Sequence, residues 1–155
     1  YAWDTTSRKE PVLLRRQMLI MNKIAKQGLV RSGKDISNPG TLGTLGMLLE
    51  TSGKGAVVDV DLIPRPKDVE LVQWLRSYQG FGYVVTCAPE SSRRVVEMYA
   101  SVGITAAVIG KVTSEPKLVV TQRDESTVMF DFDKEIITGC KPTSTVGWES
   151  VDLGK

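Results

Sequence analysis

Histidine is absent from the 155-residue sequence, and cysteine occurs only as Cys87 and Cys140. Without histidine, the chain cannot supply the usual zinc ligand sets or a catalytic triad that uses an imidazole. The two cysteines lie far apart and outside any C-x-x-C motif, so we interpret them as reduced thiols of a cytoplasmic protein. Cys87 follows the apolar run YVVT and is expected in a strand core; a nucleophilic role is the alternative.

Long apolar runs are also missing. No stretch of about 18 apolar residues occurs, which excludes a transmembrane helix, and no signal-peptide pattern follows Tyr1. Because the first residue is not Met, we expect either a fragment of a longer protein or a processed chain. The composition, 41% hydrophobic and 25% charged, is typical of one soluble globular domain.

Nucleotide-binding fingerprints are lacking as well. The segment ETSGKGA resembles a phosphate loop, but Leu48 stands where the first glycine is required and Gly55 where Ser or Thr is required. The glycines of GFG precede a strand instead of following one, which excludes a dinucleotide fingerprint. Asp131 and Asp133 share one face of a predicted strand and could hold magnesium, but an exposed strand end is the simpler interpretation, and we predict no metal site.

Charge is present but unevenly distributed. Residues 1–34 carry a net charge of +6, whereas residues 35–155 carry −4. The basic first part could meet an anionic ligand or nucleic acid, and a solvated helix face is the simpler alternative.

The periodicity of apolar residues predicts an α+β fold: a three-layer α/β/α arrangement with a mixed sheet. The first helix is expected over 12–28, with Leu14, Met18, Met21 and Ala25 along its buried stripe. We predict an N-terminal arm at 1–11, one domain at 12–139 and a loose tail at 140–155. Helices are expected at 39–51, 67–78 and 89–103, and strands at 56–63, 81–88, 104–110, 117–122, 126–133 and 135–139. The predicted core contains Trp74, Leu75, Val84, Val85, Val95, Val108 and Ile109.

The segment KDISNPGTLGTLGMLLE at 34–50 carries the candidate site. Asn38 is a favourable N-cap and Pro39 a favourable first helical residue, and the unpaired amides of a helix N-terminus attract anions. Glycines inside a helix each cost about 1 kcal/mol, so we expect Gly40 and Gly43 to let a ligand approach the backbone, whereas tight packing is the alternative. The predicted site for a phosphate or carboxylate consists of Lys34, Asp35, Ser37, Asn38, Gly40, Thr41 and Gly43.

The same segment resembles the C-terminal domain of the aminoimidazole ribonucleotide (AIR) synthase superfamily. The resemblance covers about residues 12–131 and includes the strand step GYVVTCAPE and the strand GITAAVIGKVT. It is strongest to the AIR-synthase-related proteins of methanogenic archaea. One departure is that the purine-synthesis relatives have histidine where this chain has Lys34. The matching residues are Asp35, Ile36, Ser37, Gly40, Leu42, Glu50, Ser52, Gly53, Gly55, Ala56 and Pro64.

The resemblance implies a partly ferredoxin-like domain that closes an active-site cleft. In this family an N-terminal domain carries the acidic magnesium ligands and most of the ATP site, and it forms the core of a homodimer. The implied function is therefore the substrate-side domain of an ATP-dependent, magnesium-requiring kinase or synthase with a small anionic substrate, inactive and without cofactor as this chain alone. The catalytic residues stay unassigned.

Two other hypotheses stay open. One is a non-catalytic, ferredoxin-like regulatory module that binds a small ligand, and a nucleic-acid adaptor is the weakest of the three. No membrane partner is expected.

Overall fold

The computed structural model describes residues 4–78 and 82–140. Among these residues, no helix is long and apolar enough to span a bilayer. The α+β class with a mixed sheet is confirmed. In chain order the elements are α1 (Pro11–Lys26), β1 (Ser32–Asp35), α2 (Gly40–Ser52), β2 (Gly55–Asp59), a 3-10 turn (Val60–Leu62), α3 (Leu71–Leu75), β3 (Tyr83–Thr86), α4 (Pro89–Ala100), β4 (Gly110–Thr113), β5 (Lys117–Gln122) and β6 (Glu125–Asp131).

The strands form two sheets instead of the single sheet expected. β1 pairs antiparallel with β3, with Lys34 opposite Val84. The other sheet has the order β4-β2-β5-β6, in which β2 and β5 run parallel and the remaining neighbours run antiparallel. The β5–β6 hairpin confirms the pairing predicted for the end of the domain.

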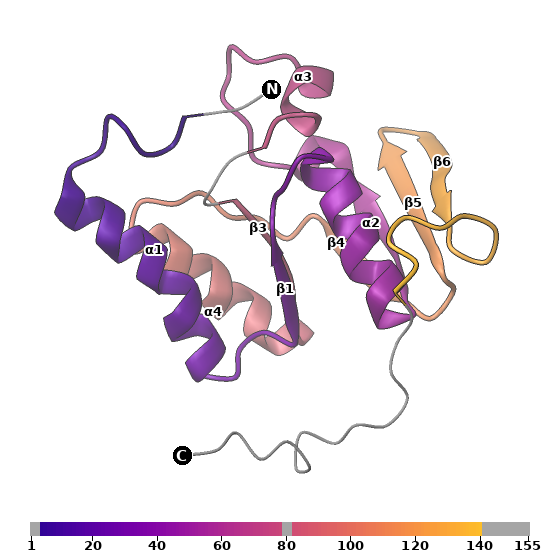
Figure 1. Cartoon of the computed structure of the whole chain (residues 1–155), viewed down its shortest axis with the longest axis horizontal. Coiled ribbons are helices and arrows are strands. Elements are labelled where there is room, and N and C mark those ends of the chain that lie inside the picture. Colours follow the sequence, from indigo (N-terminus) through magenta and orange to yellow (C-terminus); the bar gives the residue numbers. More distant parts are fainter. Residues whose placement is uncertain (1–3, 79–81, 141–155) are drawn as a thin grey trace.

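The helices separate these sheets into layers (Figure 1). α1 and α4 lie side by side on one face of the β1–β3 sheet, and α2 lies between its other face and the four-stranded sheet. α2 is therefore buried nearly all round, which explains why glycine and threonine alternate with leucine along it. The predicted α/β/α layering holds around β1 and β3, and the four-stranded sheet adds a further layer.

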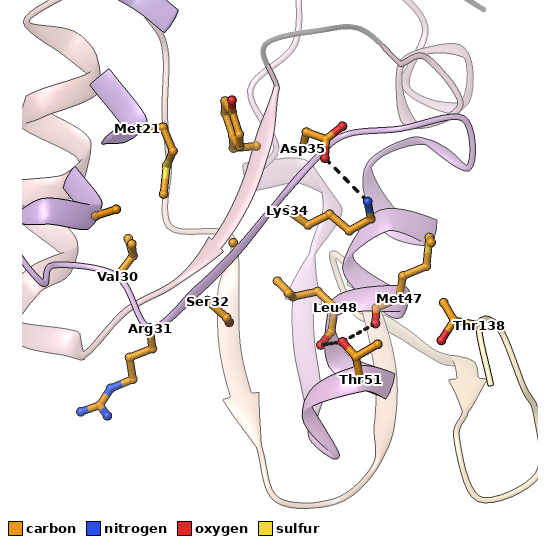
Figure 2. A pocket seen from close by; sticks show the side chains of 13 residues that line it. Met21, Val30, Arg31, Ser32, Lys34, Asp35, Met47, Leu48, Thr51 and Thr138 are labelled. Carbon is orange, nitrogen blue, oxygen red and sulfur yellow. Dashed lines mark hydrogen bonds and ion pairs between the residues drawn. The ribbon is translucent and has the colours of Figure 1, made fainter. Parts of the chain in front are cut away.

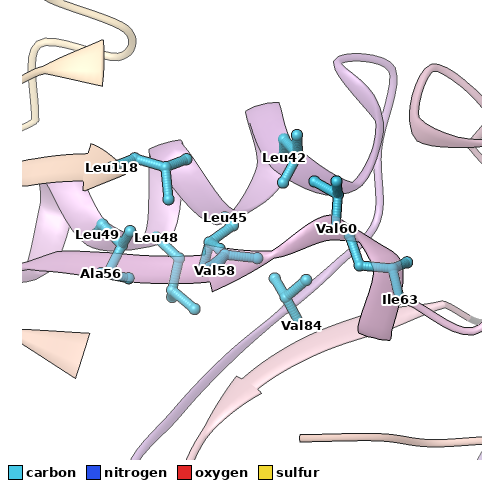
Figure 3. Packing of buried hydrophobic residues seen from close by; sticks show 10 residues of the cluster. All are labelled: Leu42, Leu45, Leu48, Leu49, Ala56, Val58, Val60, Ile63, Val84 and Leu118. Atoms are coloured by element: carbon cyan, nitrogen blue, oxygen red, sulfur yellow. The ribbon is translucent and has the colours of Figure 1, made fainter. Parts of the chain in front are cut away.

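Two apolar cores follow from this layering. Leucines of α2 point toward β2, while Val84 approaches from β3 (Figure 3). The second core joins α1 and α4 through Ile20, Ile24, Val95, Met98 and Tyr99. Of the predicted core residues, Val84 and Val95 are buried, whereas Trp74, Leu75, Val85 and Ile109 are half-buried against these clusters.

Val108 is a wrong core prediction, since 56% of its surface is exposed. The reason is that the strand expected at 104–110 does not form: β4 begins at Gly110, and its pairing with β2 reaches back to Ile109, whose carbonyl oxygen accepts the Asp59 N–H at 2.9 Å. The strand expected at 135–139 does not form either, although Ile137 is half-buried there. The helix expected at 67–78 is reduced to Leu71–Leu75.

The buried stripe of α1 is rotated from its predicted position. Gln17, Ile20 and Ile24 face the core, whereas Met18 and Ala25 are exposed. Gln17 is tolerated inside because its amide nitrogen donates to the Val102 carbonyl oxygen at 2.9 Å. This hydrogen bond allows a polar side chain to be buried in the stripe, which the periodicity of apolar residues alone cannot predict.

Candidate functional site

The candidate site is a groove along the unpaired edge of β1 (Figure 2). A cavity of 680 Å³ touches Met21 and Ala25 of α1 as well as Met47, Leu48 and Thr51 of α2. Because these helices cover opposite faces of the β1–β3 sheet, a cavity that touches both must wrap around the edge of β1 that β3 leaves open.

Backbone pairing shows which groups of β1 face this groove. The Ile36 amide donates to the Gly82 carbonyl oxygen at 2.8 Å, so that pair belongs to the hydrogen-bonded set of the antiparallel ladder. Lys34, two residues earlier, belongs to the same set, because hydrogen-bonded and open pairs alternate. The N–H and C=O groups of Gly33 and Asp35 therefore point away from β3 and toward the groove.

Lys34 and Asp35, two of the predicted site residues, line the groove. The Lys34 ammonium lies 3.7 Å from the Asp35 carboxylate, and these side chains are 30% and 62% exposed. Figure 2 shows the Lys34 side chain extending toward α2. At this distance and exposure the ion pair is weak, so the ammonium stays available to an incoming anion.

The loop that follows β1 is fixed by a buried hydroxyl. Thr44 is fully buried, and its Oγ1 accepts the backbone N–H of Ser37 at 3.1 Å. The N-cap prediction for Asn38 is wrong: Pro39 occupies the cap position without a side-chain cap, and Asn38 is exposed. Thr44 thus fixes the loop before α2, whereas the sequence had predicted a helix cap from Asn38.

Gly40 and Gly43 pack against the chain itself. Gly40 has φ +72°, and a Cβ there would lie 2.0 Å from the Leu75 carbonyl oxygen. A Cβ on Gly43 would lie 2.6 Å from Cβ of Pro39. The expectation that these glycines leave room for a ligand is therefore wrong for this arrangement, and the packing alternative accounts for both.

The structure thus divides the predicted site into two groups. Lys34 and Asp35 lie in the groove, and exposed Asn38 and half-buried Ser37 follow them in the loop. Thr41, like Gly40 and Gly43, is buried at the start of α2. This second group is covered by other parts of the chain and does not line the groove.

Glu50 is a residue whose role the sequence analysis missed. Its carboxylate accepts the N–H of Ile137 at 2.9 Å and of Thr138 at 2.7 Å, and the Thr138 hydroxyl at 2.5 Å. Burial opposes the charged carboxylate, but these hydrogen bonds outweigh it and hold the pKa of Glu50 below its ordinary value. The contacts fix Thr138 as a wall of the groove.

Gly46 leaves space for the segment of Ile137 and Thr138 to pack against α2. A Cβ on Gly46 would lie 2.9 Å from Cδ1 of Ile137 and 3.1 Å from the ring of Phe130. The glycine spacing along α2 was the available signal, but it gave no indication of which segment approaches.

The aspartates weighed as a magnesium site and the thiol of Cys87 can both be located in the described part of the chain. No group of three or more His, Cys, Asp or Glu side chains is placed to share a metal ion within residues 4–78 and 82–140. Asp131 instead pairs with Lys134 at 3.0 Å. Burial, together with the charge of Glu90, raises the pKa of the Cys87 thiol, which disfavours a nucleophilic thiolate.

Comparisons with known proteins identify the family of this chain. The family described as "AIR synthase related protein, C-terminal domain" matches residues 3–123. An uncharacterized protein of Methanocaldococcus jannaschii, MJ0640, is 47% identical over 138 residues, which is 89% of this chain and 43% of that protein. An uncharacterized protein of Synechocystis, sll0787, is 30% identical over 90% of this chain and 43% of its own length. The chain thus spans less than half the length of these relatives.

Solved structures show the same fold. Thermotoga maritima PurL complexed with ATP superposes with a TM-score of 0.71 at 21% identity, over 85% of this chain and 23% of that one. A HypE–HypF complex superposes with a TM-score of 0.63 at 16% identity, over 77% of this chain and 40% of that one.

Proposed function

The chain belongs to the AIR synthase related protein family, whose C-terminal domain it represents, and from that premise we propose that it forms the substrate side of a cytoplasmic ATP-dependent kinase or synthase. In this proposal an N-terminal domain of the same protein binds ATP with magnesium and forms a homodimer. The domain described here closes the cleft over a substrate that carries a phosphate or carboxylate.

The observation that carries the proposal is the half-buried Lys34 side chain, whose ammonium lies in a groove beside the loop of Ser37 and Asn38. An ammonium that is partly withdrawn from water and only weakly paired binds anions more strongly than one fully exposed. The resemblance to the family implies that this segment faces the cleft, and in the proposal the Lys34 charge therefore meets the substrate anion there.

Two further observations support the proposal that ATP and the substrate are bound by different domains. PurL structures of this fold are described as complexes with AMPPCP, ADP and ATP, and the present chain matches only about a fifth of PurL. The described residues hold no carboxylate cluster for magnesium. In the proposal, ATP and magnesium are therefore held mainly outside this domain, and Lys34, Asp35, Ser37 and Asn38 contact the substrate.

Calorimetry with Mg-ATP tests the proposal. The chain alone should show no binding tighter than millimolar, whereas the longer protein with its preceding domain should bind at micromolar concentrations. Absence of Mg-ATP binding by the longer protein would overturn the enzyme proposal in favour of a regulatory module.

A pair of lysine variants tests the site itself. Lys34→Gln in the longer protein should raise the substrate KM at least about tenfold, the loss of one charge-assisted contact. Lys111→Gln, on exposed β4 in the other sheet, is the matched control and should leave KM unchanged. Equal effects of the two variants would remove Lys34 from the site.

A further inference from the structure

The open edge of β1 is unusual because it lines a groove. Exposed strand edges present a row of unpaired N–H and C=O groups, and proteins normally blunt or cover them. Here the groups of Gly33 and Asp35 that point away from β3 lie in the lining of the groove, between two helices. No other described strand pairs with this edge.

The groove walls offer apolar surface on both sides of that edge (Figure 2). Met21 and Ala25 line the side toward α1, and Met47 and Leu48 line the side toward α2. Methionine side chains adapt to many shapes, so such walls accept varied side chains. An extended chain on the β1 edge would direct successive side chains alternately to these two walls.

The charges in the groove favour an acidic occupant. Lys34 extends toward α2 on the face of β1 that also carries Val84 across the ladder, whereas Asp35 belongs to the opposite face. The charged lining residues are Arg31, Lys34 and Asp35, a net charge of +1. A carboxylate on the α2 side of an added strand would lie beside Lys34.

We infer that this groove binds an extended, peptide-like carboxylate as a third strand on β1. The amide groups of the ligand pair with the backbone of Gly33 and Asp35, an apolar side chain packs on Met21, and an acidic group contacts Lys34. Main-chain hydrogen bonds supply affinity and the walls supply selectivity, as in other strand-addition sites. The inference rests on the proposed function, because it identifies the substrate anion as a carboxylate carried on an amide backbone.

Synthetic peptides test this class of ligand on the chain as it stands. The probe is acetyl-Val-Glu-Val-amide, titrated into ¹⁵N-labelled protein and followed by amide chemical shifts. We expect saturable shifts at Gly33 and Asp35, and at least about tenfold weaker binding of the Gln-for-Glu peptide. Single N-methylation of successive peptide amides should weaken binding at alternate positions only, because alternate amides face β1.

Two variants of Gly33 distinguish the loss of a backbone hydrogen bond to the peptide from a change in the shape of the groove. Gly33→Pro removes an N–H that faces the groove and no hydrogen bond to β3, a position where strands tolerate proline. Gly33→Ala is the matched control, since its Cβ would lie closest to side-chain atoms, Cγ1 of Val85 at 3.2 Å and Cε of Met21 at 3.6 Å, and the Val84 carbonyl oxygen lies at an ordinary contact distance of 3.7 Å. Peptide affinity should fall at least about tenfold in the proline variant and by less than about twofold in the alanine variant.

The inference is overturned if acetyl-Val-Glu-Val-amide causes no saturable shift at Gly33 and Asp35, or if N-methylation has no alternating effect. It is also overturned if inorganic phosphate competes with the peptide at equal affinity, because the amide backbone would then contribute nothing. None of these results bears on Mg-ATP binding by the longer protein, so the proposed function and this inference fail separately.

Discussion

The two sheets of this domain differ in how completely they are paired. The four-stranded sheet buries Ala56, Val58 and Leu118 against α2, and its two central strands are paired on both sides. The β1–β3 sheet has two strands of four residues each, and one edge of β1 stays open. A two-stranded sheet has little stability of its own, so its neighbours α1, α2 and α4 must support it.

The difference indicates a division between a rigid support and a binding surface. Stability should be concentrated in the four-stranded sheet, whereas the unpaired backbone groups, the weak Lys34–Asp35 ion pair and the groove belong to the two-stranded sheet. α2 connects the two, because its leucines pack on β2 while Thr44 holds the loop after β1.

The largest effect is expected for a methyl group added inside the four-stranded sheet. A Cβ on Gly55 would lie 1.9 Å from the Glu115 carbonyl oxygen and 2.3 Å from that of Lys117. Since backbone cannot yield as a side chain does, Gly55→Ala should lower the free energy of unfolding by about 3 kcal/mol or more, measured by urea denaturation. A loss below about 1 kcal/mol would show that this sheet is less rigid than described.

The next effect concerns the start of α2. Gly40→Ala combines a positive φ with a clash against the Leu75 carbonyl oxygen, so we expect a loss of about 2 kcal/mol or more. Gly43→Ala is the comparison: it gains up to about 1 kcal/mol of helix propensity, which offsets the strain against Pro39. Thermal unfolding of both variants measures the difference, and equal melting temperatures would contradict the packing explanation.

The glycines illustrate how far the sequence could predict this fold. Apolar periodicity identified α2, α4 and the β5–β6 hairpin, because their leucine, valine and aromatic positions repeat with the period of the element. It missed β1, because Ser-Gly-Lys-Asp contains no large apolar residue and pairs with β3 through its backbone and one hydrogen bond between the Ser32 and Thr86 hydroxyls. It could identify Gly40 as special but not that Leu75, 35 residues later, approaches it.

An intermediate effect is expected at the Glu50 contact with Ile137 and Thr138. Glu50→Gln removes the negative charge, so exchange of the Ile137 and Thr138 amides should accelerate about tenfold in hydrogen-exchange NMR. Glu97→Gln, which removes a surface carboxylate paired with Arg93, is the control and should leave both amides unchanged. Unchanged exchange in Glu50→Gln would mean that packing around Gly46 alone holds the segment.

The same contact has a defined pH dependence. Because the folded-state pKa of Glu50 lies below the ordinary value, its stabilising contribution is complete above the ordinary carboxyl pKa and is lost as pH falls through the lowered value. The Thr138 amide chemical shift should therefore titrate at a lower pH than a free glutamate. A midpoint at or above the ordinary value would show that the hydrogen bonds do not favour the charged carboxylate.

The smallest effects should occur in the two-stranded sheet. The Cβ of Gly33→Ala comes closer than 3.4 Å only to a side-chain atom, Cγ1 of Val85, and the substitution restricts the unfolded chain, so the free energy of unfolding should stay within about 0.5 kcal/mol of the parent. Lys34→Gln removes a 3.7 Å ion pair to a largely exposed partner and should change stability by less than about 0.5 kcal/mol. Losses above about 2 kcal/mol in urea denaturation would show that these residues support the fold.

The candidate site was predictable only in part, because the contacts that form the groove join residues far apart in the sequence. Charge and position indicated Lys34 and Asp35, and both line the groove. The groove itself depends on which edge of β1 stays open and on the Glu50 contact to Thr138, 88 residues away in sequence. Such long-range contacts leave no periodic pattern in the chain.

The most direct test of the central claim, that the edge of β1 is open, is residue-resolved hydrogen exchange along this one strand. In the free chain, the amides of Lys34 and Ile36 should be protected by β3, whereas those of Gly33 and Asp35 should exchange close to the rate of unprotected peptide. Uniform protection of all four amides in the free chain would contradict the account, because another segment would then already occupy the edge.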